Sequence, residues 1–196
     1  VVEPAPPQPK PPKVETPIDE RLEGFLPRED GSRLAYAAET GTKILSASFI
    51  DNGTLMLTIS ATKGKETRWS LERFEIASAT SVKLLDGTSA RLASSHRPVH
   101  RNVNRFCYSE RDAKRGVFEI WCTDLDGKNP KQITMHDGKE DLLSPAISPD
   151  GLWIVFAVVA DKPKPQGASI WKVRLDGSDL QQLTRGGDDR RPTWSD

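Results

Sequence analysis

The C-terminal half of the chain alternates short apolar runs with tight polar turns. The segment PAISPDGLWIVFAVV, at positions 145–159, holds a Ser-Pro-Asp-Gly turn between a short and a longer apolar run. Proline presets φ in such a turn, aspartate can bond its own backbone, and glycine accepts a positive φ. A third apolar run follows at 168–175, then an Asp-Gly pair and a short segment at 179–184. This pattern predicts four consecutive antiparallel strands.

The same unit recurs along the chain. Pro98, Pro145 and Pro192 are separated by 47 residues each (145 − 98 and 192 − 145). IWCTDLDGKNPKQIT (120–134) aligns without a gap with IWKVRLDGSDLQQLT (170–184). A degraded copy begins near Ser48. The repeats are therefore predicted near positions 48–97, 98–144 and 145–191, with another beginning at 192.

A repeat of four short strands at this period is typical of a β-propeller, because one sheet cannot bury both of its faces alone. The Ser-Pro-Asp-Gly turn, the Ile-Trp pair and the Asp-Gly turn resemble the PD40 (WD40-like) repeats of TolB-type propellers. The resemblance covers about positions 24–196 and is strongest from 145 onward. The copy at Pro98 departs from it, since His-Arg-Asn-Val-Asn stands where the family has its turn.

The expected fold is all-β, with about three clear four-stranded blades and partial terminal strands. Three blades are fewer than the roughly four to eight that close a propeller ring. We therefore expect an incomplete propeller, completed by remaining blades, by a partner or by a second copy in a homodimer. The alternative is a small four-bladed ring, in which the terminal strand PTWSD pairs with the segment at 31–38.

Composition narrows the class of protein. Residues 1–21 are rich in proline and poor in large apolar side chains, which predicts an extended linker before a propeller domain at 22–196. Such a spacer favours a periplasmic or otherwise exported protein. The 28 basic residues are balanced by 28 acidic ones without a basic cluster, so nucleic-acid binding is not expected. No apolar run is long enough to span a membrane.

Binding residues are expected in the connections between repeats, because these loops converge on one face of a propeller and loops carry function. Plain solubility would explain the same charges equally well. The candidates are histidines and charged residues drawn from three connections, at 86–97, 135–144 and 185–191: His96, Arg97, His136, Asp137, Lys139, Glu140, Asp141, Asp188, Asp189, Arg190 and Arg191.

The sequence gives little support for catalysis. It contains no G-x-S-x-G, H-E-x-x-H or P-loop motif. His96 and His100 are four apart, but Pro98 between them argues against a helical metal site, so neither a metal nor a cofactor is expected. Tryptophans at repeat-equivalent positions are interpreted as packing between blades rather than as a carbohydrate surface. The turn formed by Ser148, Pro149, Asp150 and Gly151 is interpreted as structural.

The resemblance implies a non-enzymatic cell-envelope propeller that mediates protein–protein interaction, with a partner similar to the peptidoglycan-associated lipoprotein that TolB-type propellers bind. Two alternatives remain open. The chain could be the propeller portion of a larger enzyme, either a prolyl-oligopeptidase-type peptidase or a propeller lyase. It could also be a structural repeat element of a larger assembly.

The two cysteines give a first testable prediction. Cys107 and Cys122 fall in the second and third strands of one repeat, and a hairpin turning at 112–116 brings them nearly opposite each other. Opposed cross-strand Cβ atoms lie about 4.5–5.5 Å apart, close to the separation that a disulfide needs. We predict a disulfide if the protein is exported, and two small buried thiols otherwise. Mass spectrometry of the unreduced protein should find no free thiol; two free thiols would exclude the bond.

Overall fold

The computed structural model describes residues 41–88, 92–93, 99–100, 103–160, 167–185 and 187–195. All of them belong to one compact unit, Ala38–Asp196. The predicted linker at 1–21 and the segment at 31–38 that was expected to close a four-bladed ring lie outside the described residues. Among the residues described, no helix is long and apolar enough to cross a membrane.

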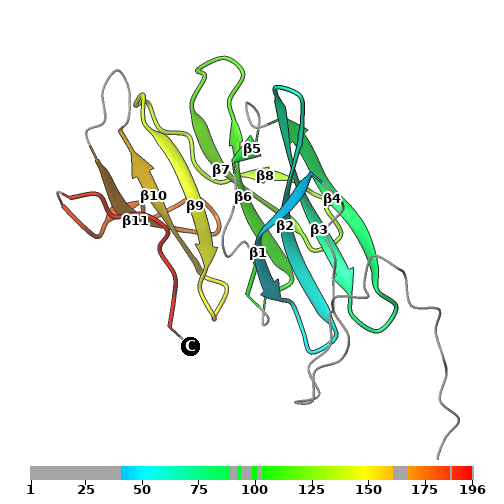
Figure 1. Cartoon of the computed structure of the whole chain (residues 1–196). Helices are drawn as coiled ribbons and strands as arrows, with labels where there is room; N and C mark the ends of the chain where they lie inside the picture. Colours follow the sequence, from blue (N-terminus) through cyan, green and yellow to red (C-terminus); the bar gives the residue numbers. More distant parts are fainter. Residues whose placement is uncertain are drawn as a thin grey trace, which may run out of the picture. The chain divides into compact units, whose positions relative to one another are not determined.

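Within the described residues, twelve strands form three four-stranded antiparallel sheets, each in sequence order (Figure 1). Sheet 1 contains β1 (Thr42–Phe49), β2 (Thr54–Lys63), β3 (Glu66–Glu75) and β4 (Thr80–Thr88). Sheet 2 contains β5 (Leu92–Ala93), β6 (Arg105–Arg111), β7 (Phe118–Asp124) and β8 (Lys131–Gln132). Sheet 3 contains β9 (Asp141–Ile147), β10 (Trp153–Val159), β11 (Ala168–Arg174) and β12 (Gln181–Gln182). The predicted all-β fold of three four-stranded blades is confirmed.

The motifs that recur in the sequence have the same structural role in sheets 2 and 3. In sheets 2 and 3 the Asp-Gly turn follows the third strand, and Gly127 and Gly177 adopt φ values of +81° and +97°. The final threonine of each repeat accepts a hydrogen bond from the third strand. Ile120 N lies 2.9 Å from Thr134 Oγ1, and Ile170 N lies 2.9 Å from Thr184 Oγ1. These side chains hold a short fourth strand that has few ladder hydrogen bonds of its own.

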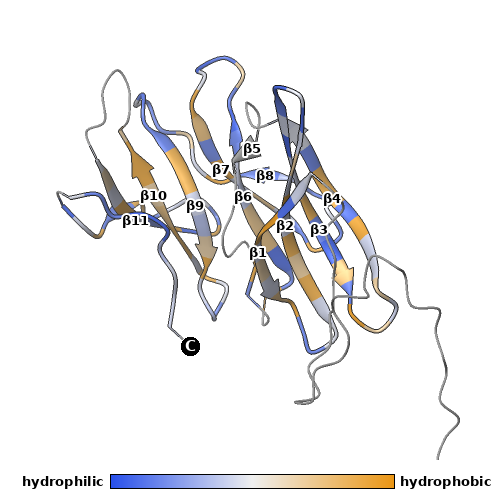
Figure 2. Cartoon of the chain, in the orientation of Figure 1, coloured by the Kyte–Doolittle hydropathy of each residue, from blue (hydrophilic) through white to orange (hydrophobic). Residues whose placement is uncertain are grey.

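Consecutive sheets pack through opposite faces of the middle strands. On β7, Ile120 and Cys122 join an apolar cluster with sheet 3, while Trp121 packs against a cluster with Met56 of sheet 1. Trp171, the repeat equivalent of Trp121, packs in turn against the cluster that joins sheets 2 and 3. Apolar residues concentrate along the strands and polar residues in the turns (Figure 2). The tryptophans at these positions therefore serve packing between sheets.

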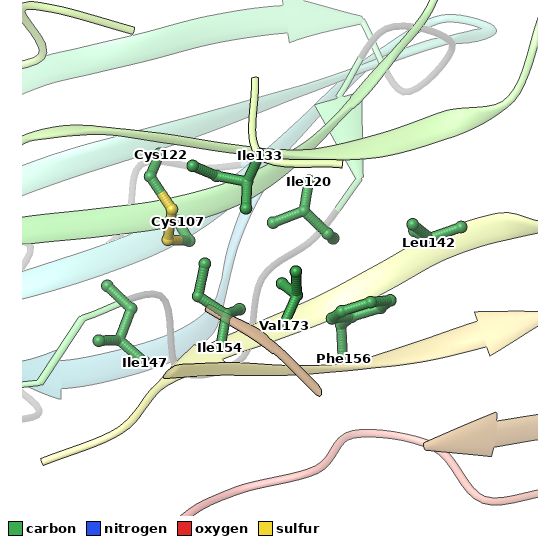
Figure 3. Packing of buried hydrophobic residues seen from close by; sticks show 9 residues of the cluster. All are labelled: Cys107, Ile120, Cys122, Ile133, Leu142, Ile147, Ile154, Phe156 and Val173. Carbon is green, nitrogen blue, oxygen red and sulfur yellow. A yellow bond between two sulfur atoms is a disulfide. The ribbon is translucent and has the colours of Figure 1, made fainter. Parts of the chain in front are cut away.

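The cysteines lie within the contact between sheets 2 and 3. Cys107 and Cys122 are direct partners in the β6–β7 register, with their Cα atoms 4.1 Å apart, and a disulfide joins them. Both side chains are buried and belong to the same cluster as Ile147 and Ile154 of sheet 3 (Figure 3). The crosslink thus stiffens the face on which sheet 3 packs.

Strand boundaries differ from the expectation in all three sheets. Strand β1 begins at Thr42, before the repeat expected near 48, and β5 lies at Leu92–Ala93, before the repeat expected from 98. Strand β9 begins at Asp141 rather than near Pro145, and a register shift opposite Ser144, which has a φ of +57°, lets the strand continue through the proline. The predicted terminal strand does not form in the described part of PTWSD. Instead, the indole nitrogen of Trp194 donates to the carbonyl oxygen of Ala146 at 3.0 Å. A side-chain contact therefore replaces the strand expected there.

The Asp-Gly turn of sheet 3 depends on a close approach to sheet 2. A Cβ atom at Gly177 would lie 2.9 Å from the carbonyl oxygen of Ile133, whereas a Cβ at Gly64 would meet nothing within 4 Å. Both glycines have a positive φ, which costs another residue about 1 kcal/mol. We predict that Gly177→Ala loses about 1–3 kcal/mol more unfolding free energy than Gly64→Ala, because its added methyl group also clashes with the Ile133 carbonyl oxygen. Urea denaturation measures the difference, and equal losses would contradict the close approach.

The turn that contains Asp150 gives a pH-dependent prediction. Its carboxylate accepts hydrogen bonds from the Ser148 hydroxyl and from the Leu152 backbone, and these bonds lower the pKa of Asp150. A carboxylate with a lowered pKa contributes stability above its ordinary pKa, and this stability is lost as the pH falls through the lowered value. Asp150→Ala should therefore reduce the melting temperature at pH 7 and reduce it less in acid. A reduction that stays constant with pH would contradict a role for the charge.

Candidate functional site

A cavity of about 520 Å³ lies where sheet 3 meets the end of sheet 2. This volume falls in the range of about 300–1,000 Å³ that is usual for ligand sites. Phe156 on β10 and Trp171 on β11 are direct partners in the strand register, and both line the cavity. Leu142 from β9 extends the same apolar wall. Figure 3 shows Leu142 and Phe156 on the side of sheet 3 that faces sheet 2.

The polar rim of the cavity comes from the connection that follows β8. Thr134, His136 and Glu140 line it there, and Gly187 lines it from the next connection. The second connection lies against β11 because Gly167, just before that strand, packs directly on the Gly187 backbone: a Cβ at Gly167 would lie 2.2 Å from the Gly187 carbonyl oxygen. Glycine is required at this contact. The start of β11 thereby holds the second connection beside the cavity.

The rim is anchored on a buried carboxylate. The Glu119 side chain on β7 is fully buried, and its two oxygens accept hydrogen bonds from Thr134 Oγ1 at 2.5 Å and from an Arg115 guanidinium nitrogen at 2.7 Å. His136 contacts the same Glu119 carboxylate twice, with its ring Nδ1 at 2.9 Å and with its backbone nitrogen at 3.3 Å. Burying a charge is costly unless it is paired and hydrogen-bonded, and here it is both. The cluster therefore fixes the position of His136.

Arg115 completes this cluster from the β6–β7 turn. Its guanidinium group also contacts the Asp112 carboxylate at 3.3 Å and donates to the His136 carbonyl oxygen. The hydrogen bond with Glu119 is the main cause that raises the pKa of Arg115 above its ordinary value. Backbone hydrogen bonds from Arg115 and Lys114 in turn lower the pKa of Asp112. The charges of this turn are thus mutually neutralised.

His136 and Glu140 face each other at the mouth of the cavity. His136 Nε2 lies 3.6 Å from Glu140 Oε2, and this buried nitrogen has no hydrogen-bond partner among the residues described. A Cβ at Gly138 would lie 1.9 Å from Glu140 Oε2 and 2.9 Å from His136 Cδ2. The absence of a side chain at Gly138 is therefore what lets the Glu140 carboxylate fold back toward the imidazole.

The structure separates the sequence-predicted candidates into three groups. His136 and Glu140 line the cavity. Asp141 belongs to β9, and its carboxylate accepts a hydrogen bond from Phe118 N at 3.0 Å, which links sheets 2 and 3. Two candidates lie outside the described residues, namely His96 and Arg97. The others are described but do not line the cavity: Asp137, Lys139, Asp188, Asp189, Arg190 and Arg191.

The candidates near the C-terminal end have partners of their own. The Arg190 guanidinium lies 2.5 Å from the Asp188 carboxylate at the surface. Asp189 uses its backbone nitrogen to donate to the Ala168 carbonyl oxygen at 3.0 Å. These contacts hold the connection against β11 without directing its charges into the cavity.

Glu119, Arg115 and Thr134 were not predicted as site residues. The available signal was the repeat itself, because Glu119 corresponds to the neutral Ser169 in the next repeat and both precede an Ile-Trp pair. A charge that replaces a neutral residue at a strand position in one repeat marks a local departure from the common packing. Within the described ranges, no three His, Cys, Asp or Glu side chains come together as metal ligands.

Comparison with known proteins shows the fold. No protein-family model matches the chain, so its assignment to the TolB-type PD40 family stays a prediction. A stretch of 68 residues is 35% identical to an uncharacterised protein of Agrobacterium fabrum, and it covers 35% of this chain and 21% of that protein.

The solved structures that the chain resembles include a β-propeller domain. An oligogalacturonate lyase in complex with manganese matches with a TM-score of 0.54 and 13% identity, covering 78% of this chain and 44% of that one. The β-propeller domain of the Trilobed protease from Pyrococcus furiosus, described as having an open velcro topology, matches with a TM-score of 0.51 and 10% identity, covering 74% and 44%. A putative TolB from Agrobacterium tumefaciens matches with a TM-score of 0.47 and 18% identity, covering 76% and 64%.

The chain spans less than half the length of the lyase and of the protease propeller domain. At these identities the similarity concerns the fold alone. The three sheets match a portion of the propeller domain of the protease. The described part of the chain is a portion of a β-propeller.

Proposed function

We propose that this chain is a non-enzymatic propeller of the cell envelope that binds another protein. The observation that carries the proposal is the cavity between sheets 2 and 3, which has an apolar wall and a polar rim built by one of the connections predicted to bind. A partner would insert a side chain into this cavity and cover the exposed apolar residues at its mouth.

The surface around the cavity supports a macromolecular partner. Met135 is 78% exposed and Leu180 is 48% exposed, and both line the cavity. Methionine is enriched in protein interfaces, and apolar surface that continues from a pocket onto the exterior favours a partner larger than the pocket. A small ligand enclosed in the cavity would leave both side chains in water.

The hydrogen bonds of the rim support binding rather than catalysis. The Thr134 hydroxyl donates to Glu119 and accepts from Ile120 N, so it is engaged on both sides. His136 directs Nδ1 to Glu119, and Ser169 Oγ accepts from the Trp171 indole. An activated nucleophile needs a hydroxyl or thiol within hydrogen-bond reach of a base. The hydroxyls that line this cavity instead serve to hold neighbouring groups in place.

The disulfide supports the proposed location. Structural disulfides persist in oxidising compartments and are rare in the cytosol. Cys107 and Cys122 are opposed, buried and joined within the apolar cluster that sheets 2 and 3 share. An exported protein could keep this bond, which agrees with the proline-rich spacer at 1–21.

Site-specific crosslinking tests the proposal. A photo-crosslinking amino acid replaces either Met135, at the cavity mouth, or Leu152, which is 53% exposed and does not line the cavity. In an envelope extract of the native organism, position 135 should give one discrete protein adduct that position 152 does not. For the purified partner, Met135→Glu should weaken binding by about tenfold, because a charge enters an apolar contact. Leu152→Glu should leave binding unchanged.

The same preparations separate binding from catalysis. Equal labelling from both positions, or equal loss of affinity in both variants, would contradict the cavity as the binding site. Turnover of peptides or oligosaccharides by the purified chain, retained in Met135→Glu, would contradict a non-enzymatic role.

A further inference from the structure

We infer that the cavity is shaped for a lysine side chain of the partner polypeptide, with the ammonium group held between His136 and Glu140. The inference rests on the proposed function, since it names the chemistry by which that same cavity recognises its partner. It follows from the positions of two acceptors, from the apolar wall of the cavity and from the neutralisation of the Arg115 charge by Glu119 and Asp112.

The first acceptor is the free nitrogen of His136. Glu119 is a carboxylate paired with Arg115, so it accepts at both oxygens and the His136 Nδ1 must be the donor in their 2.9 Å contact. In the neutral imidazole the proton is then on Nδ1, and Nε2 is an acceptor. This atom is buried and lacks a hydrogen-bond partner among the described residues. An unsatisfied buried acceptor favours a ligand that brings a donor.

The second acceptor is the carboxylate of Glu140. Its Oε2 lies 3.6 Å from His136 Nε2, and its side chain is 39% exposed, so a group entering the cavity mouth can reach it. One donor group that lies beside two acceptors 3.6 Å apart can bond to both of them. An ammonium group has three N–H donors and a positive charge, and it can therefore satisfy both atoms.

The apolar wall selects the rest of the ligand. Leu142, Phe156 and Trp171 line the cavity behind the two acceptors. A lysine carries its ammonium group on four methylene groups, and such stems pack along apolar surface while the charged end keeps polar contacts. A carboxylate ligand would instead meet Glu140 and an acceptor nitrogen. Arginine would bring a planar fork of donors suited to the two oxygens of one carboxylate rather than to two separate residues.

The Arg115 guanidinium, which donates to the His136 carbonyl oxygen, does not oppose a positively charged ligand. The Arg115 guanidinium is bound by Glu119 at 2.7 Å and by Asp112 at 3.3 Å. These two carboxylates offset its charge before the ligand arrives. Glu140 then supplies the negative charge that faces the ligand at the mouth.

Blocked tripeptides test the chemistry directly. Ac-Gly-Lys-Gly-NH₂ is compared by NMR titration of the full chain with the same peptide carrying norleucine, Nε-acetyl-lysine or arginine. The lysine peptide should shift the His136 ring signals and bind about tenfold more tightly than the other three, as expected for one charge-assisted contact. Cadaverine is the control for a small free amine. Equal binding of norleucine, or tighter binding of cadaverine than of the lysine peptide, would overturn the inference.

Three variants separate geometry from net charge. Glu140→Gln removes the facing carboxylate, and Asp137→Asn removes an exposed carboxylate from the same connection that does not line the cavity. Gly138→Ala keeps every charge but places a Cβ atom where Glu140 Oε2 lies. Glu140→Gln and Gly138→Ala should each weaken lysine-peptide binding by roughly tenfold, and Asp137→Asn by less than about twofold. Melting temperatures show that each variant is folded.

The outcomes distinguish this inference from the function on which it rests. Equal weakening in Glu140→Gln and Asp137→Asn would mean general electrostatic attraction and would overturn the inference. If the lysine peptide does not bind while position 135 still crosslinks to one partner, the function stands and the lysine assignment fails. If the peptide binds as expected but no protein adduct forms at position 135, the assignment of the cavity stands and the proposed protein partner fails.

Discussion

Packing of each sheet on the one before it is the interaction on which the rest of the structure depends. A four-stranded sheet exposes two faces, and burying apolar surface contributes roughly 25 cal/mol per Å². Sheet 2 buries apolar side chains on both of its faces, because Trp121 packs toward sheet 1 and Ile120 packs toward sheet 3. The backbone follows the same constraint, since Gly177 of sheet 3 lies directly on the Ile133 carbonyl of sheet 2.

Departures from the repeat show where this packing changes. Position 122 holds a buried cysteine in sheet 2, whereas the equivalent position in sheet 3 holds Lys172, whose ammonium lies 4.2 Å from the centre of the Trp153 ring. The far face of sheet 3 is therefore not a copy of the apolar face of sheet 2. Glu119 is a second departure, because Ser169 occupies its place in the next repeat. Lys172 makes one face of sheet 3 polar, whereas Glu119 anchors the rim of the cavity.

Much of the fold was predictable from the sequence, because the same pattern of apolar strands and polar turns occurs in more than one repeat. The gapless match of 120–134 with 170–184 predicted the strands and turns. The position of the hairpin turn at 112–116 predicted that Cys107 and Cys122 would be opposed. The start of β9 was not predictable, since the bulge at Ser144 depends on pairing with β10. The site was only partly predictable. His136 and Glu140 stood in a charged connection. The repeat marked Glu119 only as a departure from Ser169, and its burial depends on the Arg115, Thr134 and His136 groups that surround it in the fold.

The central claim is that the partner binds at the cavity between sheets 2 and 3, and amide hydrogen exchange tests it most directly. The full chain is measured alone and saturated with its purified partner. The account predicts that protection increases at 133–142 and 167–173, the segments that line the cavity, and stays unchanged at the Ser148–Gly151 turn and at 188–191. Protection confined to 188–191 or to sheet 1, with none at 133–142, would contradict it.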